Sequence, residues 1–346
     1  MQPGSDSSSD PRTFTGATPA DRFLRPVAYQ DSPEDQLPPP PRDTNPPRIR
    51  RTVAGEPTSE PVITTERADA ARGAVLLPSL PAKPELSGEA ARVIGEVPGY
   101  LGVPFVSPVF QALANYPGYL VPAWDRFKPV IGSPEFRRAA AGLGVPVGLL
   151  PGPDPALLAA DADLDRVRRY TVTFHRLLPE LLLLASCWYR GITVGAPASL
   201  ALDGRTPVEG PGPRGVPSEA ISIAPDASEP GADLARAYQE IRALHDHPRV
   251  LSYYRALGTW PGLMLGVWER LGPLARGDAY AAARDQVLAR AAAAAATLPV
   301  PVIETEDAEE VAAVLALFRT RLIPALLLDT AVVLALLGED ASIVTA

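Results

Sequence analysis

The stretch VPFVSPVFQALANYPGYLVPAWDRFKP (residues 103–129) occurs a second time as HPRVLSYYRALGTWPGLMLGVWERLGP (residues 247–273). The two copies align without a gap at an offset of 144 residues, and nine of the 27 pairs are identical, among them Trp124/Trp268. Similarity at one fixed offset is the sequence signature of a duplicated structural unit. We therefore expect two related units in one chain.

Apolar residues recur at helical spacing around the two copies, and few strand-like runs are present. The pattern predicts long helices over residues 164–190 and 308–338, with a kink or break at Pro179 and Pro324. Shorter helices are predicted at residues 133–143, 233–244 and 280–296. Phe174 and Phe318 keep the offset of 144, whereas the two prolines differ by 145, which indicates one inserted residue. The predicted fold class is all-α, an internally duplicated helical pseudo-dimer.

The predicted domain organisation follows from composition. Residues 1–72 are rich in Pro, Ser, Asp and Arg and cannot bury enough apolar surface, which predicts a disordered tail. Residues 73–194 form the first helical repeat and residues 233–340 the second. The Gly- and Pro-rich residues 195–232 between them are predicted to be an irregular linker.

Charge and targeting features limit the classes of partner. A formal net charge of −8 argues against nucleic acid. The first ten residues lack the basic start and apolar run of a secretory signal, which predicts a cytoplasmic protein. Prolines interrupt both apolar runs, at residues 97–124 and 322–337, so no membrane span is expected. The single cysteine, Cys187, lies in an apolar run and is predicted to be a buried, inert thiol.

Two packed copies can leave one asymmetric cavity between them, and we expect the ligand site there. Positions shared by the copies, such as Trp124 and Trp268, are assigned to the scaffold. Positions that differ are expected to face the cavity, as for the pairs Ser107/Leu251, Pro108/Ser252 and Val109/Tyr253.

With these segments in view, the chain resembles the group I 2-haloacid dehalogenases, which act on D and L isomers. The resemblance covers residues 85–338 and is carried by VPFV and YPGYLVPAW in the first copy, by VRRYTVTFHRLLPELLLL, and by SYYRALGTWP in the second copy. It implies an all-helical pseudo-dimer with its active site between the repeats, no cofactor and no covalent intermediate. In that family an Asp activates the attacking water and an Asn holds it.

The position-by-position match puts the catalytic Asp on Tyr253 and the Asn on Leu178. The aromatic pair of the first copy falls on Phe105 and Pro108, and only Ser252 is retained. A carboxylate is ionised at neutral pH, whereas a tyrosine is neutral and donates a hydrogen bond. The substitutions therefore predict that hydrolytic dehalogenation by the family mechanism is lost.

Two other groups have a structural interpretation. His245, Asp246 and His247 have side chains of the types that bind metals. No further ligand at a fixed spacing accompanies these three consecutive residues, so no metal site is predicted. His175 is interpreted as a partly buried structural histidine.

The sequence thus predicts a pocket lined by Phe105, Pro108, Val109, Leu178, Ser252 and Tyr253. Ser252 and Tyr253 are expected to bind substrate as hydrogen-bond donors, or Tyr253 to act as a general acid. The first hypothesis is a diverged enzyme acting on a mostly apolar small molecule, such as a carboxylic acid. The alternatives are a non-catalytic binding or regulatory protein, and an active dehalogenase with a relocated base. A homodimer is left open.

Overall fold

The computed structural model describes residues 51–53, 56–58, 86, 88–202, 211–226, 228–245 and 249–341. The predicted disordered tail, residues 1–72, lies outside these residues apart from two three-residue strands. Those strands, β1 (Arg51–Val53) and β2 (Glu56–Thr58), pair antiparallel.

The prediction of an all-α fold is confirmed. The first half of the chain forms α2 (Gly88–Leu101), α3 (Pro108–Leu113), α4 (Pro117–Ile131), α5 (Pro134–Ala141), η3 (Val147–Leu149), α6 (Pro155–Leu158) and α7 (Leu164–Thr193). Proline at the first helical position starts α3, α4 and α5, where its missing N–H costs no helical hydrogen bond. Pro179 does not break α7, contrary to one expectation, because the helix continues through it to Thr193.

The second half forms α8 (Ala232–His245), α9 (Ser252–Leu257), α10 (Pro261–Ala275), α11 (Asp278–Ala295), α12 (Ala308–Leu317), η4 (Phe318–Leu322) and α13 (Ile323–Leu336). Its helices begin where the first half predicts. The bounds of α8, α9 and α10 are those of α2, α3 and α4 shifted by 144 residues, and α11 and α12 start 144 residues after α5 and α7. The internal duplication stays a prediction, and these matching bounds are what supports it.

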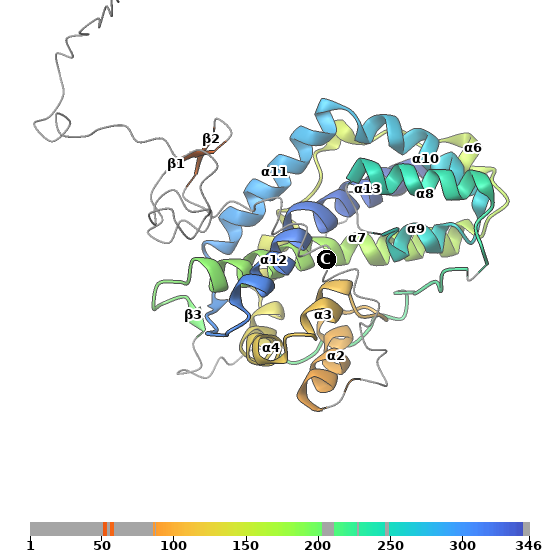
Figure 1. Cartoon of the computed structure of the whole chain (residues 1–346). Helices are drawn as coiled ribbons and strands as arrows, with labels where there is room; N and C mark the ends of the chain where they lie inside the picture. Colours follow the sequence, from red (N-terminus) through yellow and green to blue (C-terminus); the bar gives the residue numbers. More distant parts are fainter. Residues whose placement is uncertain are drawn as a thin grey trace, which may run out of the picture.

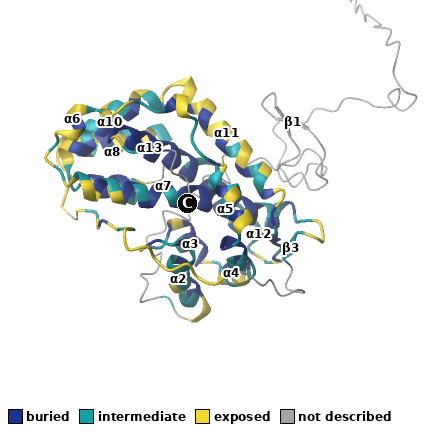
Figure 2. Ribbon diagram, turned by 180° about the vertical axis from the view of Figure 1, so that it is seen from behind, coloured by how far each residue is buried: buried dark blue, intermediate teal, exposed yellow. Residues whose placement is uncertain are grey.

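The two long helical segments, α7 and α12–η4–α13, form the centre of the molecule. Helices α7 and α13 pack against each other, and nearly every residue of α13 is buried. In Figure 1, α2, α3 and α4 lie on one side of α7, and α8, α10 and α11 lie on the other. Figure 2 shows the exposed residues on the outer faces of the peripheral helices. Most of the buried apolar residues on both sides of the central helices belong to one continuous hydrophobic core.

Ala308–Leu336 is long and apolar enough to cross a membrane, but 78% of its most apolar window is buried inside the protein. Its position at the centre of the fold identifies it as a core helix. Cys187 of α7 is also buried, as predicted.

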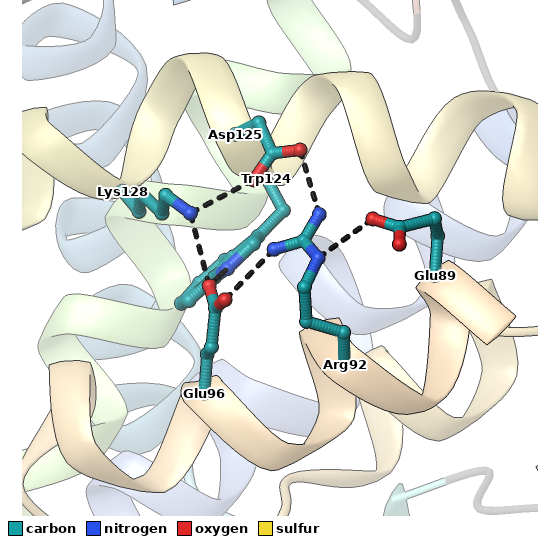
Figure 3. Close-up of polar contacts among 6 residues, drawn as sticks. All are labelled: Glu89, Arg92, Glu96, Trp124, Asp125 and Lys128. Atoms are coloured by element: carbon teal, nitrogen blue, oxygen red, sulfur yellow. Dashed lines mark hydrogen bonds and ion pairs between the residues drawn. The ribbon is translucent and has the colours of Figure 1, made fainter.

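Each half ties its outer helices together through a tryptophan and a glutamate. The indole N–H of Trp124 in α4 donates to Glu96 of α2 over 2.9 Å. Trp268 of α10 donates to Glu240 of α8 over the same distance. In the first half the carboxylate also meets Arg92 and Lys128, which join it to Glu89 and Asp125 in one ion-pair network (Figure 3). The shared tryptophans therefore contribute to the scaffold.

The second half has a buried carboxylate at a position that is apolar in the first half. Asp329 of α13 is fully buried and accepts hydrogen bonds from the hydroxyls of Tyr254 and, over 2.7 Å, Tyr280. The imidazole Nε2 of His245 lies 3.0 Å from its Oδ2. Burial alone raises the pKa of Asp329, but the histidine charge and the tyrosine donors outweigh it and hold the pKa below its usual value. We call Asp329, His245, Tyr254 and Tyr280 the Asp329 network.

Four helices of the second half, α8, α9, α11 and α13, meet at the Asp329 network. The equivalent positions of the first half are all apolar: Leu101, Phe110 and Phe136 lie 144 residues earlier, and Leu184 lies 145 residues before Asp329 because of the inserted residue. Phe110 and Phe136 there pack within a cluster of aromatic rings. At these equivalent positions the first half is therefore held by apolar packing and the second half by a buried charge.

Candidate functional site

A cavity of about 370 Å³ lies where α3, α7, α9 and the η4–α13 junction meet. Its wall is mostly aliphatic and aromatic. The lining comprises Phe105, Val106, Ser107, Pro108, Gln111, Tyr170, Phe174, Leu177, Leu178, Leu181, Ser222, Ile223, Ala224, Pro225, Arg249, Val250, Leu251, Ser252, Arg255, Phe318, Leu322, Ile323 and Leu326.

Much of this lining comes in pairs at the offset of 144 residues. The pairs are Phe105/Arg249, Val106/Val250, Ser107/Leu251, Pro108/Ser252, Gln111/Arg255, Phe174/Phe318 and Leu178/Leu322. Both copies of the repeated motif thus contribute equivalent positions to one cavity. The cavity is asymmetric because two of these pairs differ in charge: the first copy supplies the neutral Phe105 and Gln111 where the second supplies Arg249 and Arg255.

The structure brings four of the six predicted pocket residues to this cavity. Phe105, Pro108, Leu178 and Ser252 line it. Phe105 stacks on Phe174 of α7, with ring centroids 4.7 Å apart. Leu178 presents only carbon atoms to the cavity where the resemblance expects an amide.

Val109 and Tyr253 do not line the cavity, and both are fully buried. The Tyr253 hydroxyl lies 3.1 Å from that of Thr171, and its ring stacks on that of Tyr170 with a 6° interplanar angle. Both point into the core because helical geometry turns the residue after each cavity-facing Pro108 or Ser252 by about 100°. Burial raises the pKa of Tyr253 far above the neutral range. Tyr253 is therefore a neutral phenol behind the cavity wall, and its catalytic role stays a prediction.

The charged residues that line the cavity in the described part of the chain are Arg249 and Arg255. The same lining contains no Asp, Glu, His or Asn. Arg255 is exposed, and its guanidinium has no hydrogen-bond partner among the described residues. A cavity with two cations and an apolar wall is suited to an anion with an apolar body.

Tyr170 is a cavity residue that the sequence reasoning missed. It lies on α7, one turn before Phe174, and its hydroxyl has no hydrogen-bond partner in the described chain. Burial raises its pKa, and the charge of Arg255 opposes this increase. The signal was present in the sequence, since Tyr170, Phe174, Leu177, Leu178 and Leu181 lie on one helical face.

The histidines have other surroundings. His175 bonds to Thr330 and to the carbonyl of Ala341, and burial lowers its pKa to about 4, so it is a neutral structural residue as predicted. His245 belongs to the Asp329 network, while Asp246 and His247 lie outside the described residues. The described chain contains no group of three or more His, Cys, Asp or Glu side chains placed to bind a metal ion.

A second, larger hollow of about 640 Å³ lies on another side of α7 and shares Leu177 with the cavity. Its lining is rich in arginines, but nearby carboxylates bind several of them. Arg214 forms a two-bond pair with Glu180, and Arg168 pairs with Asp165. Because carboxylates already neutralise these arginines, this hollow is a weaker candidate for a small-molecule site.

The chain is similar in sequence to haloacid dehalogenases. A family model described as "Halocarboxylic acid dehydrogenase DehI" matches residues 104–254, which include both copies of the cavity-forming motif in part. The configuration-inverting 2-haloacid dehalogenase of Alcaligenes xylosoxydans xylosoxydans is 28% identical over 221 residues, or 60% of this chain and 73% of that protein. The (R)-2-haloacid dehalogenase of Rhizobium sp. (strain NHG3) is 29% identical over 248 residues, or 65% and 91%.

Solved structures give the same fold. A D-2-haloacid dehalogenase in complex with L-LA has a TM-score of 0.58 at 23% identity, covering 72% of this chain and 92% of that chain. A mutant of a D-2-haloacid dehalogenase in complex with D-2-CPA has a TM-score of 0.57 at 22% identity, covering 72% and 91%. Taken with the sequence matches, these similarities support an origin of this chain in the D-2-haloacid dehalogenase family.

Proposed function

We propose that this protein is a divergent relative of the group I dehalogenases that binds a mostly apolar carboxylic acid and no longer performs hydrolytic dehalogenation. One observation carries the proposal: the described lining of the cavity contains two arginines and no carboxylate or imidazole. The charge that attracts an acid is present, while a group that takes a proton from water at neutral pH is absent from this lining.

The family reaction needs such a base. A general base must lie within hydrogen-bond reach of the water, and its pKa must suit the working pH. Tyr253, at the position of the family's Asp, bonds to Thr171 and is held neutral by burial. Leu178, at the position of the Asn, has no polar side-chain atom to hold a water. These two substitutions support the proposed loss of the reaction.

Donors for a carboxylate head group remain. Arg255, Ser252 and the hydroxyl of Tyr170 line the cavity and can each donate a hydrogen bond. An arginine–carboxylate contact is charge-assisted and stronger than a neutral hydrogen bond. We assign the head group to these three residues and the apolar body to the walls formed by α7 and the η4–α13 junction.

The cavity also belongs to the proposed pseudo-dimer. The equivalent helix bounds in the two halves and the paired lining positions support two copies packed around one shared cavity. The second copy supplies Arg249, Ser252 and Arg255 to that cavity. A homodimer, the cytoplasmic location and the predicted domain boundaries remain proposals of this kind.

Chloride release from D- and L-2-chloropropionate tests the loss of dehalogenation. We expect none above the uncatalysed rate, with a family dehalogenase assayed in parallel as the positive control. Turnover that disappears in Tyr253→Phe or Tyr170→Phe would refute the argument about the missing base. Turnover that survives both substitutions would point to a relocated base, the alternative in which the enzyme is active.

Calorimetric titration with hexanoate tests the acid-binding cavity. Arg255→Gln should weaken binding about tenfold, because an exposed charge-assisted hydrogen bond contributes about 1–1.5 kcal/mol. The matched control is Arg166→Gln, which removes another exposed arginine, on α7, that does not line the cavity. Equal affinities for both variants would contradict a head-group site at Arg255.

A further inference from the structure

An irregular segment between the two halves of the chain crosses α7. Residues 211–226 contain no helix or strand, and α8 begins a few residues later, at Ala232. Most of the side chains in this range are exposed, and Ile223 is the one that is buried. A segment with little burial and no regular backbone pairing belongs to the least stable parts of a fold and can open locally.

One end of this segment is firmly held. Arg214 donates to the two carboxylate oxygens of Glu180, over 3.0 and 2.5 Å, and to the carbonyl of Tyr100 over 2.8 Å. The N–H of Gly215 donates to the carbonyl of Gly99 over 3.0 Å. The side chain of Glu180, on α7, is only 4% exposed, so withdrawing Arg214 would leave a buried charge uncompensated. We call Arg214 and Gly215 the fixed end of the segment.

The residues that follow are held more weakly. The backbone N–H of Ile221 donates to the hydroxyl of Thr173 on α7 over 3.2 Å. The side chain of Ile223 packs into the hydrophobic core. An exposed ion pair between Glu219 and Arg176, at 4.0 Å, adds little because solvent screens it. We call the Ile221–Thr173 hydrogen bond and the buried Ile223 the catch.

The weakly held part forms one wall of the cavity. Residues 222–225 line it, whereas Thr173 does not and lines the second hollow instead. The rest of the cavity wall comes from helices and from the residues directly before α3 and α9. Releasing the catch would therefore remove one wall of the cavity while the helices around it stay in place.

We propose that residues 216–226 form a flap over the cavity, which opens when the catch is released and which a bound ligand holds closed. A ligand that contacts the closed flap favours the closed form, because it binds that form better. Thr173 is a positioning residue, since it lies outside the cavity and acts on its wall through Ile221. The link to the ligand rests on the proposed function, which takes the ligand to be an acid.

Hydrogen exchange of two backbone amides in the full chain, without ligand, tests the flap. The amide of Ile221 belongs to the catch and that of Gly215 to the fixed end. If the flap opens on its own, Ile221 exchanges through this local opening, and its protection factor should be at least about tenfold lower than that of Gly215.

Three threonine variants test the catch. Thr173→Val removes the acceptor and keeps the shape, so it should lower the protection of Ile221 about fivefold and leave Gly215 unchanged. Thr173→Ser keeps the hydroxyl and should restore the parent value. The control is Thr193→Val near the end of α7, because both threonine hydroxyls donate to the carbonyl four residues earlier. It should leave both amides unchanged.

Hexanoate tests the link to the ligand. At a concentration of about ten times its Kd, hexanoate should slow the exchange of Ile221 about tenfold and leave Gly215 unchanged, because the closed flap binds the acid and the open flap does not. Calorimetry should give the Thr173→Val variant an affinity within about twofold of the parent, since the closed form still dominates in both.

Different failures separate the flap from the proposed function. Equal protection of Ile221 and Gly215 in the parent would overturn the flap without any variant, and so would equal exchange of Ile221 in Thr173→Val and Thr193→Val. If hexanoate binds but leaves the exchange of Ile221 unchanged, the bound acid does not hold the flap, while the acid site stands. If hexanoate does not bind, the acid site fails, and the two comparisons without ligand still decide whether the flap exists.

Discussion

Replacing Asp329 by Asn should destabilise the protein by about 3 kcal/mol at pH 6. The carboxylate is fully buried and receives donors from Tyr254, Tyr280 and His245. Removing one partner of a buried ion pair costs about 3–5 kcal/mol because the other charge stays buried and uncompensated. Asparagine keeps the shape and one acceptor oxygen, so the lower end of that range applies.

Urea unfolding followed by tryptophan fluorescence measures this free energy, and a thermal scan should show a fall in Tm of about 5 °C for a chain of this size. The control is Asp165→Asn, which removes a highly exposed carboxylate paired with Arg168 and should cost less than about 0.5 kcal/mol. A loss below about 1 kcal/mol for Asp329→Asn would refute the view of Asp329 as an ionised acceptor.

The pH dependence gives a second check on the Asp329 network. The pKa of Asp329 is lowered, so its contribution is present above about pH 4, the unfolded value, and is lost as the pH falls through the folded pKa. Burial lowers the pKa of His245, but Asp329 raises it further, so the histidine contribution is present below about pH 6.5 and is lost as the pH rises through the raised pKa. The stability difference between parent and Asp329→Asn should therefore peak between about pH 4 and 6.5.

The first half of the chain supplies the rescue experiment. Apolar residues of similar shape often replace a buried ion pair without loss of stability. A variant with the changes His245→Leu, Tyr254→Phe, Tyr280→Phe and Asp329→Leu copies the apolar character of the first half and should recover most of the stability lost in Asp329→Asn. If it is no more stable than the single variant, the two halves are not held by interchangeable packing.

Three further outcomes are expected. Gly191→Ala should lower the unfolding free energy by more than about 2 kcal/mol in a urea titration, because the added Cβ would lie 2.0 Å from a backbone oxygen of β4 (Val300–Pro301). The control Gly118→Ala has open space around the added Cβ and should be neutral or stabilising by up to about 1 kcal/mol. Tyr253→Phe should cost about 1 kcal/mol through the lost hydrogen bond to Thr171 and leave hexanoate affinity unchanged in calorimetry; a large loss of affinity would place the hydroxyl on the ligand. Glu96→Gln should destabilise the protein at pH 7 but not near pH 2. Burial raises the pKa of Glu96, but its contacts with Trp124, Arg92 and Lys128 outweigh burial and lower the pKa to about 2. Equal losses of stability at both pH values in chemical unfolding would contradict this.

The fold was readable from the sequence because its signal is repeated. Helical spacing in residues 164–190 and the fixed offset of 144 predict the central helices, and α7 and α12 begin at the expected places. The continuous path of α7 through Pro179 was not predictable, because a proline removes only one hydrogen bond and the packing of a buried helix outweighs that cost. Short helices such as α6 carry too few residues to show a period.

The cavity was readable in part. Comparing the copies singled out Pro108 and Ser252, and the family resemblance added Phe105 and Leu178; all four line one cavity. The comparison of the copies did not find Tyr170 or Arg255. Arg255 lies one helical turn after Ser252 in α9, and Tyr170 lies on a different helix, α7. Tyr253 shows the limit most clearly, since a residue type and its neighbours do not tell which way one side chain of a short buried helix points.

The one cysteine of the chain gives the protein its own reporter of opening. Thiol reagents attack the thiolate, and Cys187 is fully enclosed in α7 with a pKa that burial raises. Its alkylation in the native protein therefore requires that the central helix become accessible. The rate of alkylation, measured by mass spectrometry on the unmodified chain, reports how often the core opens, and a bound acid that stabilises the cavity should slow it in proportion to its affinity.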